Sequence, residues 1–309
     1  MAEARRASLE DRPCLRRLLE GKAYPPSWLR QVTAERRRQH DLSALEQQFE
    51  LWVNHPQVSP LVSSDAFLIA VHNQQDFATG QPETVVVEHG GELQQYGALL
   101  DLLVARAVAA GDEFVALRVH SGQEKLAEYL QTLGWAAEFA RVVRALETPL
   151  PVSEAPGLRR AGNEDRVFLA RLHLHCSPFY ESSQRRNSQW ATVGALENYL
   201  SLDFSPESQL LGWVAEEEAT PRGYVLVKLG FEGELLAGPS AYLYDIAVDP
   251  QARGRSLAGA LHEAAVGELL TRGVENLVGD ISAHNHQALA IATRRLGYGV
   301  EWQRWGLNL

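Results

Sequence analysis

The stretch Asp249-Pro250-Gln251-Ala252-Arg253-Gly254-Arg255-Ser256-Leu257-Ala258 decides how the second half of this 309-residue chain is interpreted. The apolar run Tyr242 to Val248 leads into it, and an amphipathic segment, about Leu257 to Leu270, leads out of it. A strand, a short basic glycine loop and a helix start bring unpartnered backbone N–H groups together at the positive end of a helix dipole. Gly254 permits close approach of the backbone, and Arg253 and Arg255 add cationic donors. The stretch therefore predicts a site for a phosphorylated ligand.

The composition is that of a globular protein and disfavours several classes of partner. Hydrophobic residues make up 45% of the chain, enough for a real core. No apolar run reaches membrane-spanning length, and the first ten residues are charged and unlike a signal peptide, so we expect no membrane partner. The net charge of −10 is shared equally by the two halves and disfavours nucleic acid. Two cysteines, Cys14 and Cys176, make no disulfide framework, and we expect a cytoplasmic location.

Prolines mark a break near the middle of the chain. Pro149, Pro151 and Pro156 stand close together, and proline fixes its own backbone while restricting the residue before it. The length also suggests two domains. We therefore expect a linker at residues 149–157 between a domain of residues 1–148 and a domain of residues 158–309.

The two halves end in the same order of expected elements, which is strand, helix, Leu-Gly-aromatic and strand. A shift of 163 residues overlays Leu133-Gly134 on Leu296-Gly297, Phe139 on Trp302 and Arg141 on Arg304. The common order favours an internal duplication.

The second half alternates between strand and helix patterns, with three consecutive strands before the basic loop. This order favours an α/β fold with a mixed, mostly antiparallel sheet and helices on both faces. Leu257, Leu261, Ala265 and Leu269 form a stripe to bury on that sheet. The expected strands are Leu210 to Glu216, Gly223 to Leu229, Ala241 to Val248 and Asn276 to Ile281; the expected helices are Glu164 to His175, Gly194 to Leu202, Leu257 to Leu270 and Asn285 to Leu296.

At this point the chain resembles the GNAT superfamily of acetyl-CoA-dependent N-acetyltransferases, in a tandem-domain form. The family loop reads Arg or Gln, two residues, Gly, one residue, then Gly or Ala. Arg253, Leu257 and Ala258 fit that frame, and Ser256 stands at the usual Gly position. Downstream, Asn285, Ala288 and Leu296-Gly297-Tyr298 also match the family pattern. The resemblance covers about Gly157 to Leu309 and, more weakly, Leu9 to Glu147.

The resemblance implies a place for acetyl-CoA, or another acyl-CoA, as co-substrate. Its pyrophosphate would lie on the N–H groups of Arg253, Gly254, Arg255, Ser256, Leu257 and Ala258. Its pantetheine arm would pair with the splayed strand end at Ile246, Ala247 and Val248, whose N–H groups would stabilise the oxyanion. Asn285 would face the thiol end of the cofactor.

Acyl transfer also needs a group that accepts the amine proton and a group that assists the leaving thiolate. Asp245, beside the expected thioester position, is the first candidate base, directly or through a water; a structural carboxylate is the alternative. Strand alternation predicts that Tyr242 and Tyr244 lie on the face opposite Asp245. The family's frequent acid, a Tyr seven residues after the Asn, is Ala292 here, which leaves Tyr298, His284 and His286 as candidate substitutes.

The first half lacks a comparable basic loop. After the apolar strand Thr84 to Val87 the chain reads Glu88-His89-Gly90-Gly91-Glu92, with no Arg and with acids that would repel phosphate. A Gly-Gly pair alone indicates a turn. We interpret this half as a degenerate copy that completes a pseudo-dimer, so that the protein is a monomer or a homodimer.

His173, His175 and Cys176 suggest a metal cluster at first, but residues two apart on a helix do not share a face. We therefore expect no metal. With Phe179 and Tyr180 they are candidates to line the acceptor pocket, and ordinary packing is the alternative.

The sequence as a whole predicts an N-acetyltransferase acting on an amine of an unidentified small molecule or peptide. A non-catalytic acyl-CoA-binding or regulatory protein, and a pure interaction scaffold, are the alternatives.

Overall fold

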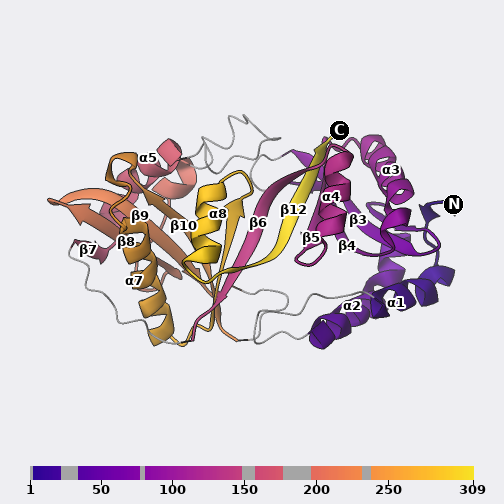
Figure 1. Ribbon diagram of the computed structural model, residues 1–309, viewed down its shortest axis with the longest axis horizontal. Helices are drawn as coiled ribbons and strands as arrows, with labels where there is room; N and C mark the ends of the chain where they lie inside the picture. Colours follow the sequence, from indigo (N-terminus) through magenta and orange to yellow (C-terminus); the bar gives the residue numbers. More distant parts are fainter. Residues whose placement is uncertain (1–2, 22–33, 77–80, 148–156, 177–195, 232–237) are drawn as a thin grey trace. The chain divides into compact units, whose positions relative to one another are not determined.

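The structure is a computed structural model that describes residues 3–21, 34–76, 81–147, 157–176, 196–231 and 238–309. The chain divides into two compact units (Figure 1). The first unit consists mainly of Met1–Phe139 and also contains Trp302–Leu309 from the other end of the chain. The second consists mainly of Ala140–Ser182 and Arg186–Glu301. The expected linker lies outside the described residues, except for Gly157.

The first unit is a sheet covered by helices on both faces. Its strand order is β1-β2-β3-β4-β5-β12, antiparallel except for the parallel pair β4 and β5. Helices α1 and α2 contribute to one apolar cluster with the sheet, and α3 and α4 contribute to another. The strands are β1 (Arg5–Arg6), β2 (Val58–Val62), β3 (Ala66–Gln75), β4 (Pro82–Gly91), β5 (Phe114–His120) and β12 (Gly299–Asn308); the helices are α1 (Arg12–Glu20), α2 (Ala34–Asn54), α3 (Leu93–Ala110) and α4 (Glu124–Thr132).

The second unit repeats this arrangement. Its strand order is β7-β8-β9-β10-β11-β6, with β10 and β11 parallel and the pairs from β7 to β10 antiparallel. Helices α7 and α8 pack on one face, and α5 with the helical residues 196–200 packs on the other. The strands are β6 (Ala136–Ala145), β7 (Leu158–Arg160), β8 (Leu210–Glu217), β9 (Thr220–Leu229), β10 (Ser240–Val248) and β11 (Asn276–Ser282); the helices are α5 (Arg166–Cys176), α7 (Leu257–Thr271) and α8 (His286–Arg294).

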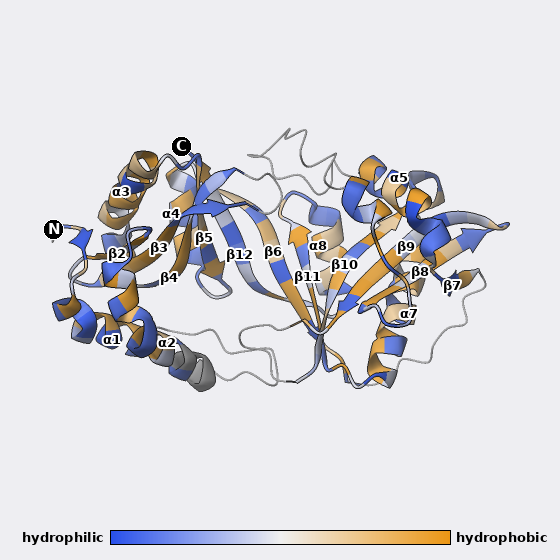
Figure 2. Ribbon diagram, turned by 180° about the vertical axis from the view of Figure 1, so that it is seen from behind, coloured by the Kyte–Doolittle hydropathy of each residue, from blue (hydrophilic) through white to orange (hydrophobic). Residues whose placement is uncertain are grey.

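These elements confirm the predicted α/β class, the mixed sheet and the repeated architecture. The helix stripe is also confirmed, because Leu261, Ala265 and Leu269 are completely buried on α7. In Figure 2 long hydrophobic stretches follow the central strands of both units, including β3, β4, β9 and β10. The helices show mixed colours, as expected for elements that bury one side only.

A matching ion pair near the start of each unit supports the duplication. Arg5 makes two hydrogen bonds to Asp11, at 2.8 and 2.7 Å, and Arg159 makes two to Asp165, both at 2.8 Å. In both cases the carboxylate also accepts from the backbone N–H three residues before it, at 2.8 Å. Such bidentate pairs have specific geometry, so their recurrence at the same place in the fold is unlike a chance similarity.

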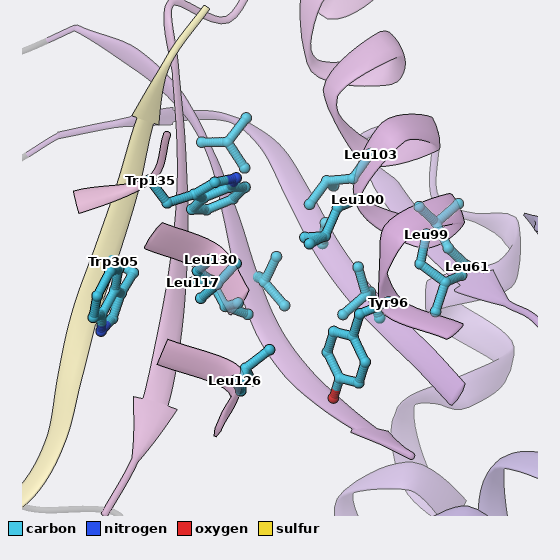
Figure 3. Packing of buried hydrophobic residues seen from close by; sticks show 14 of the residues in the cluster. Leu61, Tyr96, Leu99, Leu100, Leu103, Leu117, Leu126, Leu130, Trp135 and Trp305 are labelled. Atoms are coloured by element: carbon cyan, nitrogen blue, oxygen red, sulfur yellow. The ribbon is translucent and has the colours of Figure 1, made fainter. Parts of the chain in front are cut away.

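The last strand of each half contributes to the unit formed mainly by the other half. The part of β12 from Trp302 pairs with β5 of the first unit, from Trp302 opposite His120 to Asn308 opposite Phe114. Trp305 is accordingly part of the apolar cluster under α3 and α4, where Figure 3 shows it on the C-terminal strand beside Trp135 and Leu117. Conversely, Val142 of β6 is part of the second unit's core. Neither half of the sequence therefore supplies all the strands of one unit.

Candidate functional site

Strands β10 and β11 of the second unit separate at the place where a ligand is expected. Their parallel pairing runs from Ser240 opposite Asn276 to Leu243 opposite Gly279. β10 continues to Val248 and β11 to Ser282, with no further pairing between them in the described part of the unit. Alternate backbone N–H groups of β10 beyond Leu243 therefore face the opening, as a pantetheine-binding strand edge requires.

A β-bulge at Tyr244 changes which side chains share a face. The register of β10 with β9 shifts between Leu243 and Asp245, so two residues of β10 oppose one position of β9. Tyr244 consequently packs in the cluster under α5, on the same face of the sheet as Asp245. Leu243 packs on the other face, against α7, so its neighbour Tyr242 also lies on the α5 face. The prediction that Tyr242 and Tyr244 lie opposite Asp245 is therefore wrong, because simple alternation ignores the bulge.

The basic loop has the backbone conformation of an anion cradle. Residues Pro250–Ala252 form a single 3-10 turn, and α7 begins at Leu257. Gly254 has φ +82°, and Ser256, the N-cap of α7, has φ +62° in the left-handed region. Ser256 thus adopts the conformation that a glycine would take at this position, at a cost of about 1 kcal/mol.

Donors and cations converge on this loop. Within the described residues, none of the backbone N–H groups from Gly254 to Ala258 donates to another backbone carbonyl. The positive end of α7 points in the same direction as these donors. Arg255 is paired with Glu217 at 2.5 Å, and Arg222 with Asp249 at 3.2 Å. The loop therefore offers hydrogen-bond donors together with cations whose present partners are two carboxylates.

A buried polar network lies on the α5 face of the same strand. The Oδ2 atom of Asp245 accepts hydrogen bonds from Tyr224 Oη at 2.5 Å, from Tyr199 Oη and from His173 Nδ1 at 3.0 Å. The rings of His173 and Tyr199 stack with centroids 4.3 Å apart. Asn198 donates to the hydroxyl of Tyr244. Four elements thus meet at one carboxylate that is 7% exposed.

This network sets the charge of Asp245. Burial by itself raises the pKa of this carboxyl, but the interactions with His173, Tyr199 and Tyr224 outweigh it and hold the pKa below its ordinary value. Asp245 is therefore ionised at neutral pH with three donors on one oxygen. That arrangement disfavours the sequence-based prediction that Asp245 is itself the proton acceptor, and favours an orienting carboxylate.

The three candidates on α5 have different environments. His173 contacts Asp245, with 19% of its side chain exposed, whereas His175 is exposed and Cys176 is buried. Burial raises the pKa of the Cys176 thiol, so it stays protonated and unreactive at neutral pH. Phe179 and Tyr180 lie outside the described residues. Only His173 of this group faces the network.

The candidates at the other end of the unit have structural contacts. The hydroxyl of Tyr298 lies 2.9 Å from His262 Nε2 inside the core, and burial raises the pKa of this phenol. Asn285 caps α8 by accepting from the N–H of Ala288 at 3.1 Å. Ala292 is 5% exposed within the core cluster. These contacts disfavour Tyr298 as the acid and give Asn285 a structural role as the N-cap of α8.

The first unit retains the splay but has no corresponding loop. β4 and β5 pair only as far as Val86 opposite Leu117, and a single residue, Glu92, separates β4 from α3. The second unit has Asp249–Ser256 at this position. The expected turn at Gly90-Gly91 is wrong, since both residues belong to β4.

Side chains fill the first unit's splay. His89 Nε2 donates to the carbonyl oxygen of Arg118 on β5 at 2.7 Å, and its Nδ1 accepts from Tyr96 Oη at 2.8 Å. His89 stands two residues after the β4 bulge, the position that Ile246 holds in β10. An imidazole thus closes the strand opening at this point.

Sequence reasoning missed Tyr199 and Tyr224, the other two partners of Asp245. They lie 46 and 21 residues from it in the chain, in segments that read as ordinary helix and strand.

Among the described residues, no group of three or more His, Cys, Asp or Glu side chains is arranged to hold a metal ion. No described helix has the length and apolar character needed to cross a membrane.

The chain is similar to known acetyltransferases in sequence and in structure. The model of the Acetyltransferase (GNAT) family matches residues 170–298. A mycothiol acetyltransferase of Thermobispora bispora is 26% identical over 214 residues, which cover 67% of this chain and 68% of that protein. The structure of a GCN5-related N-acetyltransferase from Sphaerobacter thermophilus superposes with a TM-score of 0.56 at 16% identity, covering 99% of this chain and 95% of the other. The structure of a conserved protein of unknown function from Staphylococcus epidermidis superposes with a TM-score of 0.50 at 10% identity. That match covers 85% of this chain and 98% of the other.

Proposed function

Residues 170–298 belong to the GNAT acetyltransferase family, and from this premise we propose that the second unit binds acetyl-CoA at the loop 253–258 and transfers its acetyl group to an amine. The single observation that carries the proposal is the combination, in one unit, of the splayed β10 edge with the cradle at the start of α7. The first places N–H donors for an amide-containing arm, and the second places donors and positive potential for phosphates. A ligand that joins an amide-containing arm to a pyrophosphate fits this pair of features.

The residues present fit the co-substrate. Gly254 has open space where a side chain would begin, with nothing within 4 Å. Arg253, Gly254, Arg255, Ser256, Leu257 and Ala258 would hold the pyrophosphate, while Ile246, Ala247 and Val248 would hold the pantetheine arm. Acetyl-CoA, or another acyl-CoA, supplies an activated acyl group as a thioester.

The protein's own groups would carry the rest of the reaction. Backbone N–H groups of β10 near Ile246 would stabilise the oxyanion that forms on the thioester carbonyl. The amine would approach from the α5 face, where Asp245, Tyr244 and Asn198 provide polar contacts. The name of the Thermobispora relative indicates acetyl transfer to a small-molecule acceptor, and we extend only that class, a small amine, to this chain. No metal has a role in this scheme.

The first unit has a structural role in this proposal. One residue separates β4 from α3, so there is no room for a phosphate cradle, and His89 occupies the strand opening. Its carboxylates Glu88 and Glu92 add negative charge at the same place. We assign one acyl-CoA site to the whole chain, which we place in the cytoplasm as a monomer or a homodimer.

A non-catalytic acyl-CoA-binding protein is the second candidate function. It is favoured by the buried Ala292 at the position where the family often has a tyrosine acid, and by the engagement of Tyr298 with His262. It shares the cradle with the first candidate and differs only in the absence of transfer. Release of CoA in the presence of amines separates the two.

The binding step is tested by calorimetric titration of acetyl-CoA into the full chain. We expect saturable binding that Arg253→Ala weakens at least about tenfold, because the guanidinium contributes a charge-assisted bond to phosphate. Arg272→Ala, at the exposed C-terminal end of α7, removes the same charge away from the cradle and leaves the affinity unchanged. No heat of binding at millimolar acetyl-CoA, or equal loss in both variants, overturns the proposal.

A further inference from the structure

We infer that His173 is the general base of the reaction and that Asp245 orients it, an inference that rests on the proposed function. The observation behind it is the direct contact between His173 Nδ1 on α5 and Asp245 Oδ2 on β10, at 3.0 Å. The two residues are 72 positions apart in the chain, so the fold alone brings them together. An imidazole held by a buried carboxylate is the arrangement that enzymes use to deprotonate a nucleophile.

The protonation of the pair follows from the chemistry of its members. Asp245 is ionised and only accepts, while Tyr199 and Tyr224 already donate to the same oxygen. Nδ1 of His173 must therefore carry a proton and donate it to Asp245. In the neutral ring this leaves Nε2 as the basic nitrogen, on the side of the imidazole away from β10.

Two contacts fix the ring in this position. The carboxylate holds one edge, and the stacked ring of Tyr199 holds one face at an interplanar angle of 25°. Tyr199 and Tyr224 themselves are tied to Asp245, which is 7% exposed, so the support does not depend on solvent-exposed groups. His173 keeps 19% of its side chain exposed, enough for contact with a reactant.

The location also suits proton transfer. Asp245 immediately precedes Ile246, where β10 has separated from β11 and the thioester is proposed to lie. A base above Asp245 on the α5 face therefore stands beside the opening, on the face from which the acceptor is proposed to approach. His175 has no such placement, because two residues along a helix rotate a side chain to another face.

The proposed step conserves atoms and charge. The amine nitrogen forms a bond to the thioester carbonyl carbon while one N–H proton passes to Nε2 of His173. The C–S bond then breaks, the acyl group remains on nitrogen as an amide, and the thiolate leaves. The proton on His173 is returned through solvent to that thiolate, giving free CoA and the neutral imidazole.

The charged and titratable groups around His173 bear on any pH dependence. Asp245 faces it from β10, Tyr224 from β9 and Tyr199 from residues 196–200. Its own helix carries Arg171, His175 and Cys176. Among these described groups, Asp245 is the carboxylate in hydrogen-bond contact with His173.

The activity test compares the full-length wild type with His173→Gln and the matched control His175→Gln. A base beside the thioester also activates water, so acetyl-CoA hydrolysis is measured first without acceptor, as CoA released on a chromatography column, and then with benzylamine as the probe. We expect His173→Gln to lower both rates about 100-fold, with acetyl-CoA affinity unchanged. His175→Gln should match the wild type. Equal rates for the wild type and His173→Gln, or no wild-type rate above buffer, overturn the inference.

A readout independent of turnover is the tautomer of His173, seen in nitrogen NMR shifts of histidine-labelled protein and assigned with His173→Gln. We expect the proton on Nδ1 in the wild type and its redistribution toward Nε2 in Asp245→Asn, whose amide donates where the carboxylate accepted. A proton on Nε2 in the wild type contradicts the inference while leaving the proposed function intact. Absence of acetyl-CoA binding in the same samples instead contradicts the proposed function.

Discussion

The conformation of the cradle depends on single residues, as a comparison of Gly254 in the loop with Gly259 in α7 shows. Gly254 and Gly259 both have open space within 4 Å of an added Cβ. Gly254 has φ +82°, whereas Gly259 lies inside α7 with ordinary helical geometry. A methyl group at either place therefore meets no neighbour, and only the backbone conformation differs.

We expect opposite effects of the same substitution at these glycines. Gly254→Ala should lower the free energy of unfolding by about 1 kcal/mol, because an L residue is strained in the left-handed region. Gly259→Ala should raise it by about 0.5 to 1 kcal/mol, since alanine favours the helix. Urea denaturation without ligand measures both, and changes of the same sign would contradict the described loop.

The buried His262 makes stability depend on pH. Burial lowers its pKa to about 4, and its Nδ1 has no hydrogen-bond partner among the described residues. Between about pH 6.5 and 4 the unfolded chain binds a proton at this histidine that the folded chain excludes. Stability is therefore lost as the pH falls through this window, by about 3 kcal/mol.

The variant His262→Gln isolates this effect. It keeps a polar side chain toward Tyr298 but removes the titrating ring. We expect the unfolding free energy of the wild type to fall by about 3 kcal/mol more than that of the variant between pH 7 and pH 4. Urea denaturation of both proteins at each pH measures this. A difference that stays constant over this range would exclude a neutral buried His262.

Residue by residue, local features were predictable and distant partners were not. The backbone conformation of the loop depends on neighbours in sequence, so the need for a glycine at position 254 could be predicted directly. The environment of Asp245 depends on side chains that the fold brings from 21 to 72 residues away. Our inference that Asp245 orients a base, and is not itself the base, therefore required the structure.

Among elements, the hairpin of β8 and β9 contributes a carboxylate that pairs with the cradle loop. Glu217, at the end of β8, pairs with Arg255 of the loop at 2.5 Å. A phosphate that binds the loop has to compete with this carboxylate for the guanidinium. The pair is substantially exposed, with 58% of the Arg255 side chain accessible, so its strength is modest.

We expect Glu217→Gln to bind acetyl-CoA up to about fivefold more tightly than the wild type, because the variant frees Arg255 and removes a repulsive charge. The control Glu218→Gln lies at the hairpin turn and changes the net charge equally. Calorimetry at low salt provides the comparison, in which the gain should exceed that of the control. Weaker binding by Glu217→Gln would show that Glu217 supports the loop instead.

The β-bulges explain a second limit of sequence interpretation at this scale. Strand positions and lengths of β8 to β11 were predicted to within a few residues, because short apolar runs bounded by polar or turn residues mark them. The bulge at Tyr244 inserts a residue without any glycine or proline to announce it, so face assignments after it were inverted. The same irregularity at Val87 of β4 recurs in the first unit.

At the scale of the whole molecule, duplication was readable from the matching ends of the two halves. The contribution of each terminal strand to the other unit was not predictable, since the sequence pattern of β6 or β12 does not specify which sheet edge the strand joins. Arg304 illustrates the outcome. It comes from the last strand, yet it bonds Glu83 and lies 2.8 Å from Glu138 in the first unit.

The central claim is that the chain has one acyl-CoA site and that it lies in the second unit. Both units keep the β-bulge and the splay, but only the second has the eight-residue loop Asp249–Ser256, while His89 closes the opening in the first. In our proposal the second unit carries out the reaction and the first unit has a structural role.

Amide hydrogen exchange of the full chain with and without saturating acetyl-CoA tests this claim most directly. N–H groups that bind phosphate or pantetheine exchange more slowly than those that face water. We predict slower exchange in residues 246–258 and no change in residues 88–97. Protection of residues 88–97, or its absence from 246–258 under saturating ligand, would contradict the account.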